Sequence, residues 1–303
     1  MNFADRLNNA IQQKKTPLVV GLDPRAERLP KSFAVDTTHD PQDLASIYEQ
    51  FCKEIIDVVS PLVPAVKPQA AFFENLGPSG MSALWQVVRY AQSKGLLVIM
   101  DAKRGDIGST AEAYATAFLG NESDSAWGCD ALTVNPYLGD DSLEPFTNRC
   151  IETGSGIFVL VRTSNPGGKM LQELVASEQK IYSIVADHVQ GLAKQTIGQT
   201  GYGCVGAVVG ATNPQQLAIL RKQMPNTIFL VPGIGAQGGT ARDVAAAFDD
   251  AGLGAVINSS RAIIFAYENE KYSSAQGWQD SVQKSTVDTI EAIADATAAG
   301  NLN

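Results

Sequence analysis

Short apolar runs alternate with longer stretches of helical periodicity along the chain. The runs are rich in β-branched residues and too short for core helices. Their apolar character is nearly continuous, which is typical of parallel strands that helices cover on both faces. The pattern predicts strands at 16–23, 65–73, 96–103, 131–137, 156–164, 204–212, 227–234 and 254–261.

Helix signals occupy the segments between these runs. Asp40 followed by Pro41 predicts an N-cap and a first helical position. Thr240 and Asp243 have the spacing of a capping box. The segment 274–298 is expected to form a long terminal helical region. Strands and helices therefore alternate from one end of the chain to the other.

This alternation predicts a single (β/α)8 barrel over residues 1–303. An open, doubly wound sheet is the alternative, but no GxGxxG motif follows the first run. No low-complexity linker divides the chain. Two connections look long, at about 24–39 and 165–177, and long loops after barrel strands commonly shape the active site.

Composition and charge narrow the range of partners. Hydrophobic residues make up 45% of the chain and charged residues 18%, which is enough to build a sizeable core. Lys and Arg total 23 against 32 Asp and Glu, so the net charge is −9. Such a chain is a poor partner for nucleic acid or an anionic membrane, although a small anionic substrate can still meet a local positive patch. Residues 1–15 lack an apolar signal core and no run reaches membrane-span length, so we expect a cytoplasmic protein.

The cysteine and histidine content excludes several chemistries. The chain has 4 Cys without a CxxC spacing, which excludes a zinc framework and a secreted disulfide scaffold. With 2 His, a His-rich metal site is excluded, and a Ser-His-Asp triad would depend on one of them. We expect structural roles for Cys129, Cys150, His39 and His188.

Charged residues gather at the ends of the expected strands, where a barrel carries its catalytic groups. Asp101 and Lys103 are two residues apart on one run and therefore point to the same face. Lys67 lies on the neighbouring run, and Asp23 and Asp106 lie at or just beyond strand ends. Desolvated charges persist only when they are paired, and perturbed charge clusters favour functional sites. We therefore expect a lysine and carboxylate cluster in the barrel mouth.

Structural explanations exist for the same residues. The cluster could be a solvated ion-pair network at the end of a barrel. Asp106 could simply cap a helix at 107–119. Lys67 could extend its ammonium to water, and Asp23 could start a turn. The functional interpretation depends on their coincidence at one end of one barrel.

A glycine-rich loop at 233–239 predicts a phosphate site after the seventh run. Its backbone N–H groups would be exposed at the start of a helix, a common arrangement for anion binding. Ser260 and Arg261 follow the eighth run beside it, and an arginine can bind phosphate with two parallel hydrogen bonds. A flexible turn next to a surface arginine is the alternative.

These motifs resemble the orotidine 5′-phosphate decarboxylase family, in its longer bacterial branch. The segment DAKRGDI at 101–107 matches the DxKxxDI signature of that family. The order and strand placement agree over nearly the whole chain. The accompanying motifs are GLDP at 21–24, VKPQ at 66–69, PGIGAQGG at 232–239 and SSRAI at 259–263.

The resemblance implies decarboxylation of orotidine 5′-monophosphate to UMP, without a metal or a cofactor. Lys103 resembles the proton donor to C6 of the pyrimidine, and Asp101 the carboxylate that faces the leaving CO2 group. Lys67 and Asp106 would complete an alternating charge array. Asp23 and Lys67 would bind ribose hydroxyls.

The resemblance also implies a homodimer with shared sites. Asp106, Ile107 and Thr110 would reach into the active site of the partner subunit. The other implied substrate contacts are Ser164 with the pyrimidine ring and Gln237 and Arg261 with the phosphate. The loop 165–168 would then be a mobile lid.

Two other functions remain open from the sequence. A magnesium-dependent phosphosugar decarboxylase or synthase on the same barrel would carry a carboxylate at the position of Lys67, so the lysine argues against it. A catalytically inactive barrel that binds a nucleotide or serves as a scaffold is the second alternative. The intact set of Lys67, Asp101, Lys103 and Asp106 argues against that one.

Overall fold

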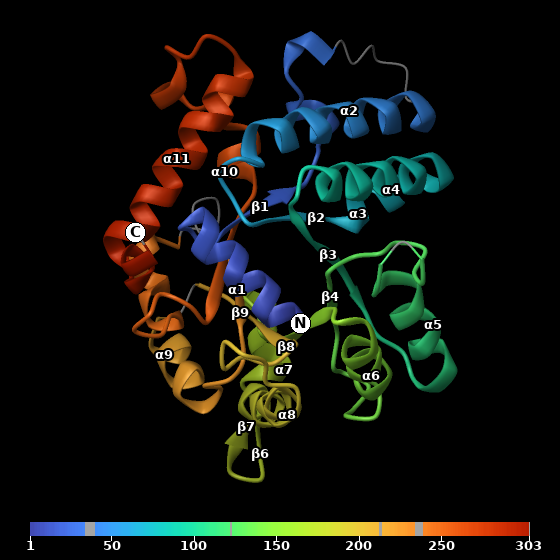
Figure 1. Ribbon diagram of the computed structural model, residues 1–303, viewed down its shortest axis with the longest axis vertical. Coiled ribbons are helices and arrows are strands. Elements are labelled where there is room, and N and C mark those ends of the chain that lie inside the picture. Colours follow the sequence, from blue (N-terminus) through green and yellow to red (C-terminus); the bar gives the residue numbers. More distant parts are fainter. Residues whose placement is uncertain (34–39, 122, 212–213, 234–238, 303) are drawn as a thin grey trace.

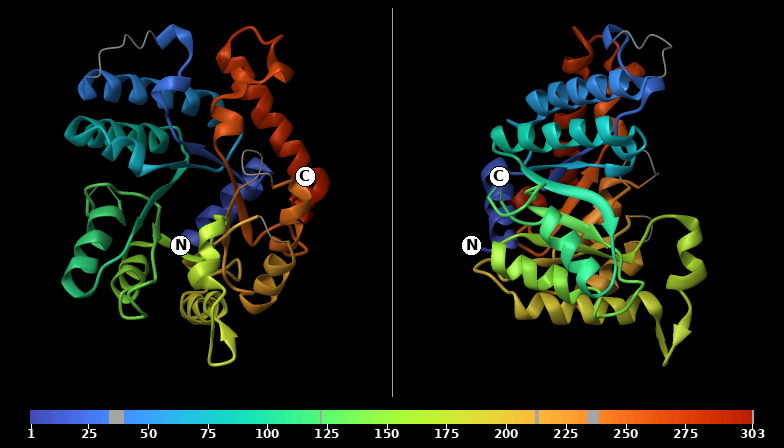
Figure 2. Two further views of the ribbon diagram at one scale, coloured as in Figure 1. Left: turned by 180° about the vertical axis from the view of Figure 1, so that it is seen from behind. Right: turned by 90° about the vertical axis from the view of Figure 1, so that its right-hand side faces the viewer.

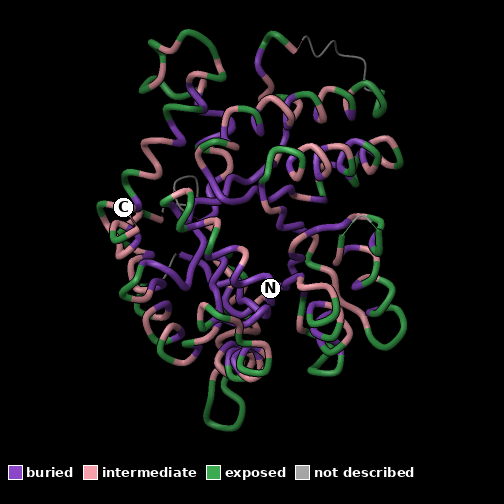
Figure 3. Tube along the Cα trace, viewed as in Figure 1, coloured by how far each residue is buried: buried purple, intermediate pink, exposed green. Residues whose placement is uncertain are grey.

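The computed structural model describes residues 1–33, 40–121, 123–211, 214–233 and 239–302. Gln237 and His39 lie outside the described residues. Buried segments run along the strands and the inner sides of the helices, and exposed segments form the periphery (Figure 3). The expected single-domain organisation stays a prediction.

Parallel strands close into a barrel in the order β1-β10-β9-β8-β5-β4-β3-β2. Figure 1 shows the helices arranged around these strands. The open-sheet alternative is therefore wrong and the (β/α)8 barrel is confirmed. Each strand lies inside one predicted run or exceeds it by one residue. The strands are Leu18–Leu22 (β1), Ala65–Pro68 (β2), Leu97–Arg104 (β3), Ala131–Val134 (β4), Gly156–Arg162 (β5), Val205–Val209 (β8), Phe229–Pro232 (β9) and Ala255–Ser259 (β10).

Helices cover the outside of the barrel between consecutive strands. Asp40 caps α2 through its side chain, and Thr240 and Asp243 form the expected capping box, here on a 3₁₀ helix. Within the described residues, no helix combines the length and apolar content that a bilayer crossing requires. The α-helices are Phe3–Lys14 (α1), Pro41–Val59 (α2), Ala70–Glu74 (α3), Gly77–Ser93 (α4), Gly108–Phe118 (α5), Glu144–Thr153 (α6), Lys169–Gln172 (α7), Ile181–Gln195 (α8), Pro214–Gln223 (α9), Arg261–Ile264 (α10) and Trp278–Ala296 (α11).

Two segments differ from the sequence prediction. The run at 65–73 is a strand only to Pro68, forms one more bridge between Gln69 and Asp101, and then continues as α3. The long connection at 165–177 is partly ordered: it contains α7 and the first strand of a two-stranded antiparallel hairpin, Val175–Ala176 (β6) with Gln179–Lys180 (β7). This hairpin projects from the body of the molecule (Figure 2).

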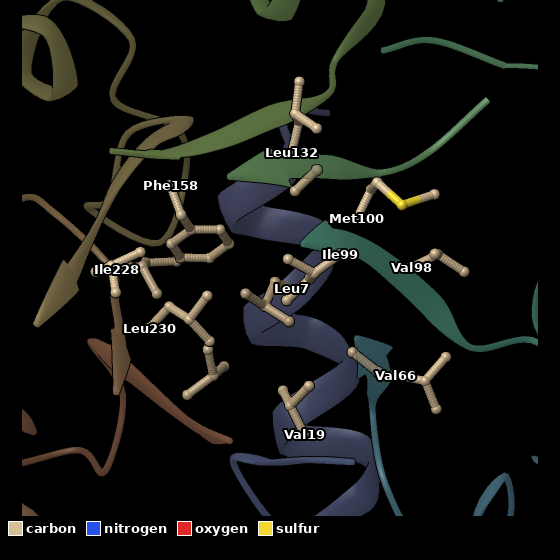
Figure 4. Close-up of a cluster of buried hydrophobic side chains, with 14 of the residues drawn as sticks. Leu7, Val19, Val66, Val98, Ile99, Met100, Leu132, Phe158, Ile228 and Leu230 are labelled. Atoms are coloured by element: carbon tan, nitrogen blue, oxygen red, sulfur yellow. The ribbon is translucent and has the colours of Figure 1, made fainter. Parts of the chain in front are cut away.

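Helix α1 closes the N-terminal end of the barrel. Figure 4 shows Leu7 of this helix among the inward side chains of Ile99, Phe158 and Leu230. The rings of Phe3 and Phe158 pack edge to face at 5.8 Å between centroids. These side chains are buried, and their removal from water stabilises the barrel from below. The mouth at the other end is where the strands present their polar residues.

Candidate functional site at the barrel mouth

Three charged side chains meet at the mouth, at the C-terminal ends of β2 and β3. The Asp101 carboxylate lies between two ammonium groups: Oδ2 is 2.6 Å from Lys67 Nζ, and Oδ1 is 2.5 Å from Lys103 Nζ. Lys67 and Asp101 are buried, whereas the Lys103 side chain is 46% exposed. The three charges therefore extend from the buried Lys67 through Asp101 to the Lys103 ammonium group, which a substrate can reach.

Two neutral side chains complete the hydrogen bonding of Asp101. Gln69 Nε2 donates to Oδ2 at 3.1 Å, and the Thr133 hydroxyl donates to Oδ1 at 3.0 Å. Gln69 follows β2 and Thr133 lies on β4, so both neighbours of β3 hold this carboxylate. Neither residue was predicted from the sequence. Both are polar residues inside expected strands, at 65–73 and 131–137, and this was the available signal.

The backbone at Lys103 departs from the extended strand that the sequence predicts. Its φ of 49° is left-handed, an uncommon conformation for a residue other than glycine. The register of β3 against β4 shifts between Met100 and Arg104, and the Lys103 amide N–H donates to Thr133 Oγ1 at 2.9 Å. A strained conformation of this kind persists where the surrounding structure enforces it. In this conformation the Lys103 side chain points back along the strand, and its ammonium group contacts the Asp101 carboxylate.

Electrostatics favour the charged forms of the buried pair. Burial by itself raises the pKa of the Asp101 carboxyl, but the charges of Lys67 and Lys103 outweigh burial and hold that pKa well below its usual range. Burial by itself lowers the pKa of Lys67, yet the carboxylates of Asp101 and Asp23 raise it above its ordinary value. The site therefore keeps an ionised carboxylate against a cation across neutral pH.

Asp23 lines the mouth directly after β1. Its negative charge acts on the Lys67 ammonium, which lies on the adjacent strand. Its Oδ1 is shielded from water and has no hydrogen-bond partner among the described residues. A buried carboxylate oxygen without a donor is costly, so this atom is suited to accept a hydrogen bond from a ligand.

Asp106, Ile107 and Thr110 lie beyond the mouth, around the start of α5. Asp106 Oδ1 accepts a hydrogen bond from the Ile107 N–H at 2.8 Å, but Ile107 itself holds the N-cap position, so Asp106 is not the helix cap. Thr110 is exposed, and the Ile107 side chain is 56% exposed. Across the described part of the chain, no hydrogen bond or ion pair joins Asp106 to Lys103.

Ser260 and Arg261 follow β10, whereas residues 234–238 of the expected phosphate loop lie outside the described residues. Ser260 follows β10 and donates a hydrogen bond to the Gly21 carbonyl at 3.1 Å. Arg261 is the first residue of α10 and lines a pocket of about 790 Å³ between α10 and α11, to which none of Lys67, Asp101 and Lys103 contributes. Ser164 follows β5 and lies against Gly210, where an added Cβ would come within 2.8 Å.

The cysteines lie outside this site. Cys129 and Cys150 are buried and unpaired by disulfides, and burial raises the pKa of both thiols, which makes them poor nucleophiles. His188 is partly buried on α8. Among the described residues, no group of three or more His, Cys, Asp or Glu side chains is arranged to hold a metal ion.

Comparisons with known proteins agree with this site. The sequence model of the Orotidine 5'-phosphate decarboxylase / HUMPS family matches residues 16–299. An orotidine 5'-phosphate decarboxylase of Rhodopirellula baltica is 55% identical over 97% of this chain and 99% of its own. One of Caldicellulosiruptor bescii is 40% identical over 90% of this chain and 92% of its own.

Solved structures give the same result. The OMP decarboxylase of Leishmania donovani superposes with a TM-score of 0.75 at 34% identity, covering 98% of each chain. The UMP synthase of the same organism gives a TM-score of 0.77 at 36% identity, with 98% of this chain matched to 56% of that longer one. With sequence, fold and charged mouth in agreement, the chain belongs to the Orotidine 5'-phosphate decarboxylase / HUMPS family.

Proposed function

We propose that this chain is an enzyme that decarboxylates orotidine 5′-monophosphate to UMP and CO2, a step of pyrimidine synthesis. The observation that carries the proposal is the Asp101 carboxylate held between the ammonium groups of Lys67 and Lys103. Breaking the bond between C6 and the carboxylate carbon leaves an electron pair in the plane of the ring, where the π system cannot spread it. A cation already in place is what such a carbanion requires.

Lys103 supplies that cation and then the proton. As CO2 leaves, the electron pair remains on C6 and the Lys103 Nζ donates a proton to it, which gives UMP and a neutral amine that solvent reprotonates. Two unit charges about 4 Å apart at an effective dielectric constant of about 20 interact by about 4 kcal/mol. A very slow uncatalysed reaction needs roughly 20 kcal/mol, so binding of the remote phosphate supplies much of the rest.

The other residues hold the substrate. Asp23, with its unpartnered Oδ1, and Lys67 bind ribose hydroxyls. Arg261 and the loop at 233–239, including Gln237, bind the phosphate, and Ser260 stands beside them. Ser164 contacts the pyrimidine ring. The reaction uses no metal or cofactor in this proposal, and the protein acts in the cytoplasm.

The active enzyme in this proposal is a homodimer with shared sites. The exposed positions of Ile107 and Thr110 next to Asp106 support it, because an apolar side chain as exposed as Ile107 is suited to a subunit contact. Mixing Lys103→Ala with Asp106→Ala subunits tests it. Hybrid dimers then contain one site with both defects and one intact site, so random mixing restores roughly a quarter of wild-type activity. If each active site lay within a single subunit, mixing the two variants would restore no activity.

The fall in pyrimidine absorbance during incubation with orotidine 5′-monophosphate tests the activity itself. We expect turnover by the wild type and equal rates with and without EDTA. Loss of turnover in EDTA, restored by Mg²⁺, would instead favour a metal-dependent phosphosugar enzyme on the same barrel. No turnover under either condition would support a binding protein.

A further inference from the structure

Asn258 presents a second buried polar atom without a partner at the mouth. It lies on β10, and its side chain belongs to the buried set with 8% exposure. Its Oδ1 is shielded from water and accepts no hydrogen bond within the described part of the chain. Buried amide groups in folded proteins are nearly always hydrogen-bonded, so this exception calls for an explanation.

The strand register places Asn258 on the inner face of the barrel. In parallel strands, residues paired in register face the same side, as do residues two apart on one strand. Gly21 pairs with Lys67, and Val19 pairs with Asn258. Because Val19 and Gly21 are two residues apart on β1, the side chains of Lys67 and Asn258 both face the interior of the barrel. A Cβ added to Gly21 would lie 3.2 Å from Asn258 Oδ1. The amide therefore occupies space that the missing side chain of Gly21 leaves open.

Asn258 lies between the two ends of the proposed substrate site. Strand β1 separates it from Lys67 and the charge cluster, and three residues further along the chain is Arg261. A nucleotide with its base at Lys103 and its phosphate at Arg261 must place its sugar across β1 and β10. Sugar hydroxyls are donors, and an unpartnered carbonyl oxygen is an acceptor.

We infer that Asn258 is a substrate-binding residue whose Oδ1 accepts a hydrogen bond from a ribose hydroxyl of the nucleotide. The inference rests on the proposed function, because it takes the base and phosphate positions from it. A donor supplied by the ligand removes the cost of a buried amide oxygen that the protein leaves unpaired. Asn258 thereby favours ribonucleotides over nucleotides that lack the contacted hydroxyl.

Asn258→Ala and the similarly sized Asn258→Leu test this inference. Decarboxylation is measured with orotidine 5′-monophosphate and with its 2′-deoxy and 3′-deoxy analogues. We expect both variants to lose about tenfold or more in kcat/KM with the full substrate. With the analogue that lacks the contacted hydroxyl, wild type and variants should differ by less than about twofold.

A purely structural role gives a different pattern. An equal loss on all three substrates, or no loss on any, would overturn the inference while wild-type turnover still supports the proposed function. No wild-type turnover would overturn the proposed function first. Asn9→Ala, at an exposed position on α1, is the matched control and should leave kcat/KM unchanged on every substrate.

Discussion

Two carboxylates at opposite ends of the barrel, Asp5 at the base and Asp23 at the mouth, differ in their hydrogen bonding. At the base, both carboxylate oxygens of Asp5 are satisfied: they accept hydrogen bonds from the Gln199 N–H at 3.0 Å, the Thr200 N–H at 2.8 Å and the Thr200 hydroxyl at 2.9 Å. At the mouth, Asp23 Oδ1 and Asn258 Oδ1 have no partner among the described residues. The buried carboxylate at the base is therefore fully hydrogen-bonded, and the one at the mouth is not.

This difference distinguishes the carboxylate that stabilises the fold, Asp5, from the carboxylate that lies at the proposed substrate site, Asp23. Asp5 joins α1 to the segment before β8 and closes the base. One atom at the base, Asn8 Oδ1, is also unpartnered, although its amide nitrogen donates to Thr200 Oγ1. At the mouth, the unpartnered oxygens lie on β10 and directly after β1, next to the strand that carries Lys67. Substitutions at the two ends should consequently have different effects.

The largest effect is expected from Lys103→Ala at the mouth. Loss of the proton donor and of the preorganised cation should lower kcat by roughly 10⁴-fold or more. The melting temperature should change little, because the Lys103 side chain is 46% exposed and Lys67 still pairs with Asp101. Steady-state assays with thermal unfolding check both. Lys222→Ala, an exposed lysine on α9, is the control, and wild-type-like activity of Lys103→Ala would refute the assignment.

Arg261→Ala should produce the next largest loss. Removing two charge-assisted hydrogen bonds to phosphate should lower kcat/KM by roughly 10²–10³-fold. Because the lost interaction is with a remote part of the substrate, added phosphite with a substrate lacking phosphate should rescue the wild type better than the variant. An unchanged kcat/KM in Arg261→Ala would place the phosphate elsewhere.

At the base, Asp5→Asn should reduce stability without reducing activity. The amide presents one acceptor where three donors converge, so the free energy of unfolding should fall by about 2 kcal/mol. In a chain of this size we expect a fall in melting temperature of about 3 °C, measured by calorimetry. Activity well below that temperature should match the wild type. If Asp5→Asn lost kcat while its stability stayed unchanged, the base could not be assigned to stability and the mouth to activity.

The smallest expected effect is the pH dependence of the difference in melting temperature between the wild type and Asp5→Asn. Burial by itself raises the pKa of Asp5, but the hydrogen bonds from Thr200 and Gln199 outweigh it and lower the pKa. A lowered native pKa contributes stability above the unfolded value of about 3.9, and this contribution is lost as pH falls through the native pKa. The melting temperatures of wild type and Asp5→Asn should therefore converge below about pH 4. A constant difference between about pH 6 and pH 3 would show that the charge is not responsible.

Local sequence patterns predicted the barrel well because each strand carries its own signal. Continuous apolar runs identified the barrel strands, and the spacing of Asp101 and Lys103 identified the cluster. The left-handed backbone at Lys103 was not predictable, because it depends on Thr133 of the next strand rather than on neighbours in sequence. Asn258 was missed for a similar reason. The lack of a hydrogen-bond donor for its Oδ1 depends on how the strands pack and cannot be seen in the sequence. Contacts of Asp106 with a second subunit remain a prediction.

The docking of α1 has a consequence for how the protein is made. Helix α1 is synthesised before the segment that it binds, because Gln199, which donates to Asp5, lies 194 positions later in the chain. The first helix therefore waits, with Leu7 uncovered, until most of the barrel has been synthesised. Contacts so distant in sequence form slowly, so the closing of the barrel base is expected to be a late step of folding.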